Sequence, residues 1–357
     1  EASPAAVCAA AAQLRSHYDF RLAVVGESNA DLARSLRHYL ADGAGQHAAA
    51  GNRLATGSRR LAFVFSGQGP QWFAMGRELR EVEPVFAETL RAIDALLQPL
   101  SGWSLLAELS ADERDSRLDE TERAQPALFG IQVALAALWK SWGIEPDGVV
   151  GHSIGELAAL HVAGVLELPE AVRLVWLRAS AMQQAAPGAM VAVSLDEKAA
   201  SALVAPFGDA LSIGALNSPG GVVLSGKTEA LAKALRQLDA RGVNHRALAV
   251  KYAFHSAQMQ SLAMQFEAAA GRVASITPRL PFYSTTSGQS ETAHFDAAYF
   301  ARNVRQPVRF AAAIDAMLKD GFNTFLEIGP HPALSASIAE CAAAREVAPT
   351  LLASLRR

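Results

Sequence analysis

Most of the chain alternates short apolar runs with longer amphipathic stretches. Apolar runs bounded by turn residues are typical of buried strands, whereas apolar residues recurring every three or four positions are typical of helices. In the larger part of the sequence, the predicted strands cover 61–65, 148–150, 281–284 and 324–328. The predicted helices cover 71–79, 84–97, 124–142, 156–163, 170–184, 297–303, 310–319 and 332–344. Strands that alternate with helices predict an α/β fold with a parallel sheet covered on both faces.

The pattern changes between 187 and 250, where strands and helices follow in the order βαββαβ. The predicted strands cover 189–193, 211–215, 221–225 and 245–250, and the predicted helices cover 197–205 and 228–241. This order is typical of a ferredoxin-like split motif, which can close on itself as a small domain. We therefore expect 187–250 to be a subdomain inserted into a core made of 61–186 and 251–345.

Residues 1–60 read as a small α/β unit that precedes the core. A helical start, a strand at 21–25 and a helix at 29–40 are followed by small and polar residues at 41–59. Gly43, Gly45, Gly51 and Gly57 favour a loose connector there.

The composition and charge of the chain exclude several classes of function. The chain has 357 residues, is 51% hydrophobic and carries a net charge of −3, so it has a large core and no basic footprint for nucleic acid. The two cysteines, Cys8 and Cys341, lie far apart and outside metal-ligand spacing. We find no signal-peptide pattern and no apolar run long enough for a membrane span. The sequence thus predicts a cytoplasmic protein in a reducing setting, without a membrane partner.

The stretch Gly151-His152-Ser153-Ile154-Gly155 joins a predicted strand to a predicted helix. A serine between two glycines at such a junction is typical of a nucleophile elbow, a turn tight enough to need glycine on both sides. This setting predicts a hydrolase-like core with Ser153 as nucleophile. An ordinary turn of small residues is the alternative.

An activated serine needs a base, and two histidines are candidates. His255 lies in KYAFHSAQM, where the inserted domain returns to the core, and His331 lies in FLEIGPHPAL after the last strand of the core. In serine hydrolases whose catalytic residues follow one another along the chain as serine, acid and histidine, the base would correspond to His331 and the acid to Glu327 or Asp315. However, His331 lies between two prolines, a setting that is more typical of the start of the helix that follows than of a catalytic base. Without further evidence, a histidine in the position of His255 is more often structural than catalytic.

Two further features suit acyl chemistry. In SGQGPQW, the glycines around Gln68 let backbone N–H groups turn toward a ligand. The N–H groups of Gln68 and Ile154 are therefore candidate oxyanion donors; a βα turn without a ligand is the alternative.

Arg178 lies on the flank of an apolar helix face. Such an arginine either extends toward water or turns inward as a fork for a carboxylate, and the sequence alone favours the first.

Together these pieces resemble the acyltransferase domain of modular type I polyketide synthases, which is related to malonyl-CoA:acyl carrier protein transacylases. The resemblance covers about 60 to 355 and rests on motifs in a fixed order, namely FSGQGPQW, TERAQPALFGIQVAL, VVGHSIGELAAL, LRASAMQQ, KYAFHSAQM, FARNVRQPVRF and LEIGPHPAL. Residues 1–60 resemble the linker that follows a ketosynthase. Residues 346–357 resemble the start of the linker after the acyltransferase, as expected for one domain of a longer multienzyme.

The resemblance implies a Ser–His dyad with Ser153 as nucleophile and His255 as its base. Arg178 would bind the free carboxylate of the acyl group, and Gln68 and Ile154 would supply the oxyanion donors. The acyl group would pass from acyl-CoA to Ser153 and then to an acyl carrier protein, with ping-pong kinetics and without a metal or redox cofactor. A serine hydrolase and a silent carrier-docking domain are the rival interpretations.

The resemblance also implies supporting and selective residues. Asn303 falls where the family places a polar residue that steadies the histidine. Ile154 and Phe254 are similar to malonyl-type domains, whereas Tyr252 is similar to the methylmalonyl pattern. We expect malonyl-CoA as substrate because the Phe254 ring would fill the space of an α-methyl group; methylmalonyl-CoA or mixed use is the alternative.

Overall fold

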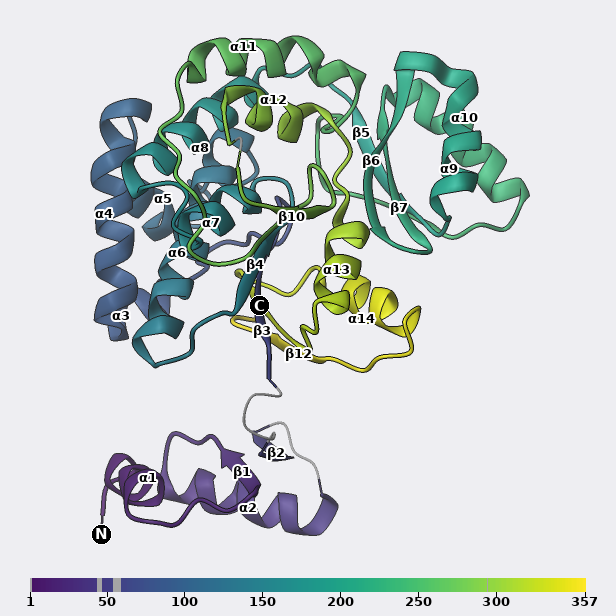
Figure 1. Ribbon diagram of the computed structural model, residues 1–357. Helices are drawn as coiled ribbons and strands as arrows, with labels where there is room; N and C mark the ends of the chain where they lie inside the picture. The colour runs from purple at the N-terminus through teal and green to yellow at the C-terminus, as the bar shows by residue number, and fades with distance from the viewer. Residues whose placement is uncertain (1, 44–46, 54–58, 294) are drawn as a thin grey trace. The chain divides into compact units, whose positions relative to one another are not determined.

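The computed structural model describes residues 2–43, 47–53, 59–293 and 295–357 (Figure 1). The chain forms two compact units, Glu1–Arg59 and Arg60–Arg357. Each is described by itself.

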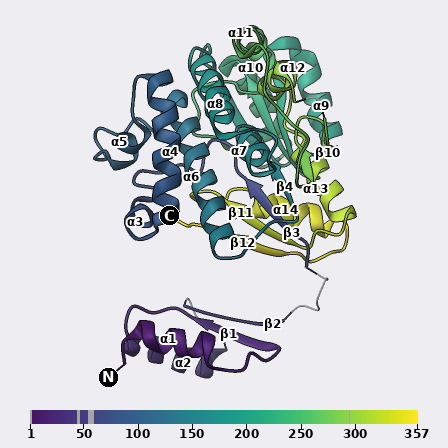
Figure 2. The ribbon, with the colours of Figure 1, turned by 60° about the vertical axis from the view of Figure 1, so that its left-hand side comes forward.

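The first unit contains two helices and a two-stranded antiparallel sheet (Figure 2). Its elements are α1 (Pro4–Gln13), β1 (Phe20–Val24), α2 (Asn29–Asp42) and β2 (Ala48–Asn52). Strand β2 corrects the prediction of a continuous connector at 41–59, because its AAAGN sequence has little strand propensity and becomes extended by pairing with β1. Gly43 ends α2 with φ +70°, whereas Gly45 and Gly57 lie outside the described residues.

A six-stranded sheet forms the centre of the second unit, in the order β10-β9-β4-β3-β11-β12. Its strands are β3 (Leu61–Phe65), β4 (Gly148–Gly151), β9 (Phe282–Ser284), β10 (Gln289–Glu291), β11 (Thr324–Ile328) and β12 (Thr350–Ala353). All neighbours are parallel except β10, which is antiparallel to β9. Every residue of β3 and β11 is buried, as expected for parallel strands covered on both faces.

The last strand, β12, lies within 346–357, the segment that resembles the start of a linker. Its residues pair with β11 from Thr324↔Thr350 to Glu327↔Ala353, so this segment forms an edge of the central sheet.

Helices cover both faces of the sheet, with α4, α6 and α8 on one side and α13 and α14 on the other (Figures 1 and 2). They are α3 (Arg77–Val82), α4 (Pro84–Ser101), α5 (Leu105–Ser110), α6 (Thr121–Ser141), α7 (Gly155–Val162), α8 (Leu168–Gln183), α11 (Gln260–Ala270), α12 (Ala297–Arg305), α13 (Phe310–Lys319) and α14 (Ser335–Ala343). Across the described residues, no helix is long and apolar enough to cross a lipid bilayer.

Two helices begin later than predicted. The helix expected at 71–79 begins at Arg77, because the chain first passes through Gly76 in the left-handed conformation at φ +72°. The helix expected at 332–344 begins at Ser335. Helices α5 and α11 were not predicted from the sequence.

The inserted subdomain has a four-stranded antiparallel sheet in the order β6-β7-β5-β8, the order of a ferredoxin-like fold. Its elements are β5 (Ala189–Val193), α9 (Glu197–Val204), a 3-10 turn (Ala205–Ala210), β6 (Leu211–Ser218), β7 (Gly221–Gly226), α10 (Thr228–Ala240) and β8 (His245–Ala247). Helices α9 and α10 cover one face (Figure 1). The other face joins the large core through Met190, Ala215 and Val223. The predicted fold class is confirmed.

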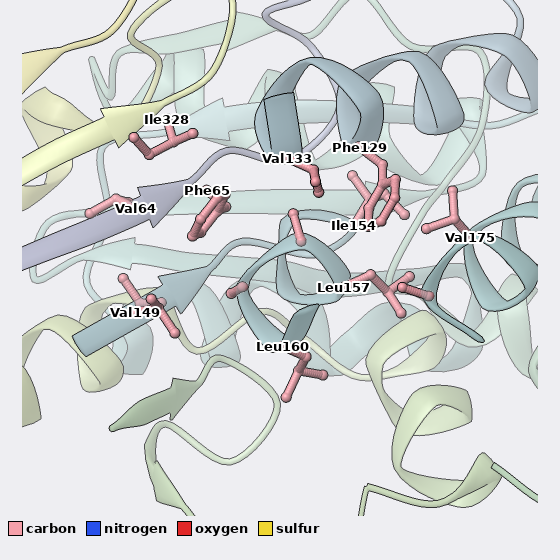
Figure 3. Packing of buried hydrophobic residues seen from close by; sticks show 14 of the residues in the cluster. Val64, Phe65, Phe129, Val133, Val149, Ile154, Leu157, Leu160, Val175 and Ile328 are labelled. Atoms are coloured by element: carbon pink, nitrogen blue, oxygen red, sulfur yellow. The ribbon is translucent and has the colours of Figure 1, made fainter. Parts of the chain in front are cut away.

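The helix after the serine is packed on all sides, which holds the serine turn in a rigid setting. Figure 3 shows Ile154, Leu157 and Leu160 among apolar side chains from the sheet and from α6 and α8. These neighbours are Val64, Phe65, Val149, Ile328, Phe129, Val133 and Val175.

Candidate active site

Ser153 lies in a turn between β4 and α7 that allows only glycine two residues before it and two residues after it. Its own φ is +54°, a left-handed conformation that is uncommon for a residue with a side chain. A Cβ atom on Gly151 would lie 2.3 Å from the Glu156 backbone nitrogen, and one on Gly155 would lie 2.3 Å from the Phe65 carbonyl oxygen. The glycines are therefore required by backbone contact, as in a nucleophile elbow.

His255 is the histidine that reaches Ser153. The Ser153 Oγ and His255 Nε2 atoms are 2.7 Å apart, and His255 Nδ1 donates to the Gln306 carbonyl oxygen at 2.9 Å. Because a carbonyl only accepts, Nδ1 carries the proton and Nε2 is left to accept from the serine hydroxyl. The pair has the geometry of a nucleophile and its general base.

The environment keeps this imidazole neutral. Burial lowers the pKa of His255 to about 3, and the charges of Arg178 and His152 act in the same direction. A neutral His255 can accept the serine proton over the whole physiological pH range.

Arg178 turns inward, so the interpretation that it extends toward water is wrong. Its side chain is 1% exposed, with Nη2 donating to Ser153 Oγ at 2.9 Å and Nη1 donating to Gln125 Oε1 at 2.7 Å. Burial lowers the pKa of Arg178 to about 9, which leaves the guanidinium charged at neutral pH.

This buried cation has no anionic partner of its own. Among the described residues no carboxylate forms an ion pair with Arg178, and its Nε atom has no hydrogen-bond partner. The nearby charge of Glu156 raises the pKa of Arg178, but the Glu156 carboxylate accepts its hydrogen bonds from Ser284, Thr285, Thr286, Tyr299 and Asn303. A buried, unpaired guanidinium beside a nucleophile is a site for an anionic group.

Gln125 links the predicted site residues. It accepts from Arg178 and donates from Nε2 to Gln68 Oε1 at 3.2 Å, while Gln68 Nε2 donates to Thr121 Oγ1 at 3.4 Å. The Gln68 loop also approaches the elbow, because a Cβ on Gly67 would lie 3.5 Å from Ser153 Cβ. The motif TERAQPAL contains Gln125, but no pattern in the sequence distinguishes this residue as part of the site.

Asn303 has a different role from the predicted one. Its Nδ2 donates to Glu156 Oε2 at 2.8 Å and to the Ser153 carbonyl oxygen at 3.3 Å, so it supports the serine turn. The group that orients His255 is the carbonyl of Gln306, which sequence reasoning missed. Every residue carries a carbonyl, so no sequence signal marks this one.

Two of the three proposed selective residues, Tyr252 and Phe254, pack against each other. The rings of Tyr252 and Phe254 are 5.7 Å apart, and Gln183 Nε2 donates to the Tyr252 hydroxyl at 3.3 Å. Phe254 and Ile154 are both buried. His152 before the serine is partly buried; its Nε2 atom is 3.0 Å from Asn217 Oδ1, and desolvation lowers its pKa to about 4.

The rival base and acids lie elsewhere. Glu327 accepts from the backbone N–H groups of Ala333, Leu334 and Ser335, so this carboxylate, and not His331, holds the start of α14. His331 is exposed and accepts from the Arg357 N–H. Asp315 pairs with Lys319 and Arg345. Within the part of the chain that the structure describes, no group of three or more His, Cys, Asp or Glu residues could hold a metal ion.

Comparison with known proteins identifies the family of the chain. The model of the acyl transferase domain family matches residues 62–357. Polyketide synthase GfsB of Streptomyces halstedii is 40% identical over 349 residues, which are 97% of this chain and 6% of that protein. Erythronolide synthase EryA2 of Saccharopolyspora erythraea is 37% identical over 92% of this chain and 9% of its own length. The chain thus spans a small part of these relatives.

Solved structures of single domains match over most of their length. The acyltransferase domain from the second module of the salinomycin polyketide synthase is 39% identical, with a TM-score of 0.87 over 99% of this chain and 82% of that one. The malonyl CoA-acyl carrier protein transacylase of Coxiella burnetii is 28% identical, with a TM-score of 0.76 over 84% of this chain and 95% of that one. The chain therefore belongs to the acyl transferase domain family and is an acyltransferase of the modular polyketide synthase type.

Proposed function

We propose that this domain transfers a malonyl extender unit from CoA to an acyl carrier protein through an acyl-enzyme on Ser153. The observation that carries the proposal is the buried, unpaired guanidinium of Arg178, which donates to the Ser153 hydroxyl. Malonyl is an acyl group with a free carboxylate, so binding it next to the nucleophile would pair this charge.

In the first half-reaction, Ser153 Oγ attacks the thioester carbonyl while His255 Nε2 takes the hydroxyl proton. The backbone N–H groups of Gln68 and Ile154 stabilise the oxyanion of the tetrahedral intermediate. The C–S bond then breaks, and the CoA thiolate leaves with the proton from the imidazolium. The Gln306 carbonyl holds the His255 ring in one orientation during both proton transfers.

The second half-reaction reverses the first with another thiol. The phosphopantetheine thiol of a carrier protein gives its proton to His255, and its sulfur attacks the seryl ester. The C–O bond to Ser153 then breaks, Ser153 Oγ takes the proton back from the imidazolium, and the malonyl group remains on the carrier sulfur. The carrier protein, a covalently linked ketosynthase and a role in antibiotic biosynthesis are parts of this proposal, suggested by the polyketide synthases among the relatives.

The preference for malonyl over methylmalonyl rests on Phe254. Its buried side chain precedes the base and packs against Tyr252, so the ring occupies volume beside the reacting centre. Methylmalonyl-specific or mixed use is the second candidate, favoured by Tyr252. A serine hydrolase would release the acyl group to water and has no use for a buried guanidinium beside its nucleophile.

Intact-mass measurement after incubation with malonyl-, methylmalonyl- and acetyl-CoA tests the proposal. We expect the wild-type protein to gain one malonyl group, the Ser153→Ala protein to gain none, and added carrier protein to receive the group faster than water does. His331→Ala is the matched control and should keep the reaction. Malonyl found on the Ser153→Ala protein would show that another residue is the nucleophile.

A further inference from the structure

The base lies on a backbone turn that needs external support. His255 has φ +56°, so both members of the Ser–His pair adopt the left-handed conformation. Glycines lie two residues before and two residues after Ser153, whereas the two residues on either side of His255 include no glycine. A strained conformation of this kind persists only where the surrounding structure fixes it.

The inserted subdomain supplies a buried hydroxyl to this turn. Ser225 of β7 is 0% exposed, and its Oγ donates to the Phe254 carbonyl oxygen at 2.5 Å. On the same strand, Val222 and Leu224 pack in the core of the subdomain, whereas Val223 faces the large core. Because successive side chains of a strand point to opposite faces of the sheet, Ser225 lies on the same face as Val223. It is therefore a polar residue on a buried, otherwise apolar face.

The neighbouring strand leaves room for this contact. A Cβ atom on Gly214 of β6 would lie 3.0 Å from Ser225 Cβ and 3.4 Å from the Phe254 carbonyl oxygen. Any side chain at 214 would therefore crowd the hydroxyl and the carbonyl that it binds.

The same small sheet holds both sides of the base. Ser212 Oγ accepts from the Ala257 N–H at 3.3 Å, two residues after His255. Strand β6 also binds the segment that follows Gln306, with Leu216 N–H donating to the Val308 carbonyl at 2.8 Å and Val308 N–H donating to the Gly214 carbonyl at 3.0 Å. The base and the carbonyl that orients it are thus fixed to the inserted sheet, whereas Ser153 belongs to the large core.

We propose that Ser225 is a positioning residue for the base: by binding the Phe254 carbonyl, it fixes the left-handed turn at His255 and so places Nε2 against Ser153. This inference rests on the Ser153–His255 couple of the proposed function, and it assigns a part in that couple to the inserted subdomain. Ser225 itself touches no reacting atom.

The test measures how fast Ser153 reacts with a fluorophosphonate probe, which needs neither a thioester nor a carboxylate site. Ser153 Oγ forms the P–O bond, the P–F bond breaks, fluoride leaves and His255 takes the hydroxyl proton. Ser225→Ala removes the donated hydrogen bond, and we expect the labelling rate to fall at least about tenfold, because small misplacements of a catalytic group have large effects on rate. Ser225→Thr retains a hydroxyl and should restore most of the rate.

Leu224→Val is the matched control, because it perturbs the adjacent residue of the same strand on the opposite face. Thermal unfolding of all variants separates lost positioning from lost folding. A Ser225→Ala protein that labels at the wild-type rate would overturn the inference, as would an equal loss of rate in Leu224→Val at the same melting temperature. If the fluorophosphonate labels Ser153 but malonyl-CoA does not acylate it, the malonyl proposal fails and the role of Ser225 is still decided.

Discussion

At the scale of single residues, the site is organised by one buried positive charge. Arg178 binds the nucleophile and Gln125, and its charge also contributes to the low pKa of His255. In the proposed function one side chain would therefore bind the carboxylate of the acyl group, and its charge also favours the neutral form of the base. These two effects can be separated by experiment.

Arg178→Ala should remove malonyl transfer and spare transfer of an uncharged acyl group. A malonyl carboxylate would then be buried without a partner, and breaking such a buried pair costs about 3–5 kcal/mol, or at least a hundredfold in rate. Acylation rates with malonyl-CoA and acetyl-CoA give the ratio directly. Arg173→Ala, which removes an arginine paired with Glu170 on the same helix, is the control. An unchanged malonyl-to-acetyl ratio in Arg178→Ala would contradict the carboxylate site.

The pH dependence of acetyl transfer tests the effect on the base. Burial and the Arg178 charge lower the pKa of His255 to about 3, so the wild-type rate should stay high well below the usual histidine pKa of about 6.5. Removing a positive charge favours protonation, so the acid limb of the profile should move to higher pH in Arg178→Ala. A limb that stays in place, or moves to lower pH, would show that Arg178 does not act on the base.

Phe254→Ser should shift extender choice toward methylmalonyl. Serine would open the space that the ring fills, and one methyl group is worth roughly 1–3 kcal/mol, so the shift should not exceed about a hundredfold. An equimolar competition between the two acyl-CoAs, read by intact mass, measures it on both proteins. Wild-type protein that prefers methylmalonyl would show that Tyr252 or other pocket residues outweigh Phe254.

The residues that the sequence could predict are those whose side chains carry the chemistry. The elbow pattern marks Ser153, and ordered motifs select His255 and Arg178, although spacing alone favoured an outward arginine. The Gln306 carbonyl and the bond from Asn303 to Ser153 depend on how α12 meets the elbow, and no local pattern encodes that meeting.

At the scale of elements, buried apolar runs and periodic helices were predictable, and strands that depend on their partner were not. Strands at 61–65 and 324–328 and the helix at 310–319 agree with β3, β11 and α13 in both bounds. By contrast, β2 is a strand only because β1 pairs with it, and β12 only because β11 does. The contact between α7 and β3 is a clear case in which tertiary packing dictates sequence.

Gly155→Ala should prevent this contact. The added methyl group would lie 2.3 Å from the Phe65 carbonyl oxygen and 2.7 Å from that of Ser66, and neither backbone can move without shifting β3. We expect a loss of about 3 kcal/mol or more in the free energy of unfolding, as for severe overpacking. Gly51→Ala is the control, because no atom lies within 4 Å of its added Cβ. Urea unfolding compares the two, and a Gly155→Ala protein of wild-type stability would show that the elbow does not need its second glycine.

At the scale of the whole molecule, the two units differ in what they contribute. Every residue of the candidate site belongs to Arg60–Arg357, which also contains both hydrophobic cores. In Glu1–Arg59, none of the described side chains is fully buried. The sequence located this division near residue 60 from the loss of regular pattern after the second helix, but it gave no sign that the first unit buries so little.

A protein of residues 60–357 should therefore keep the chemistry of the full chain. Hydrophobic burial is the main stabilising term in folding, and the residues of the first unit that the structure describes include no buried core, so removal of this unit should leave the stability of the second unit unchanged. We expect equal rates of acyl-enzyme formation with malonyl-CoA and equal melting temperatures for the two proteins. The separate peptide 1–59 should show no cooperative thermal transition by circular dichroism. A shortened protein that melts earlier and acylates more slowly would show that the first unit stabilises the catalytic one.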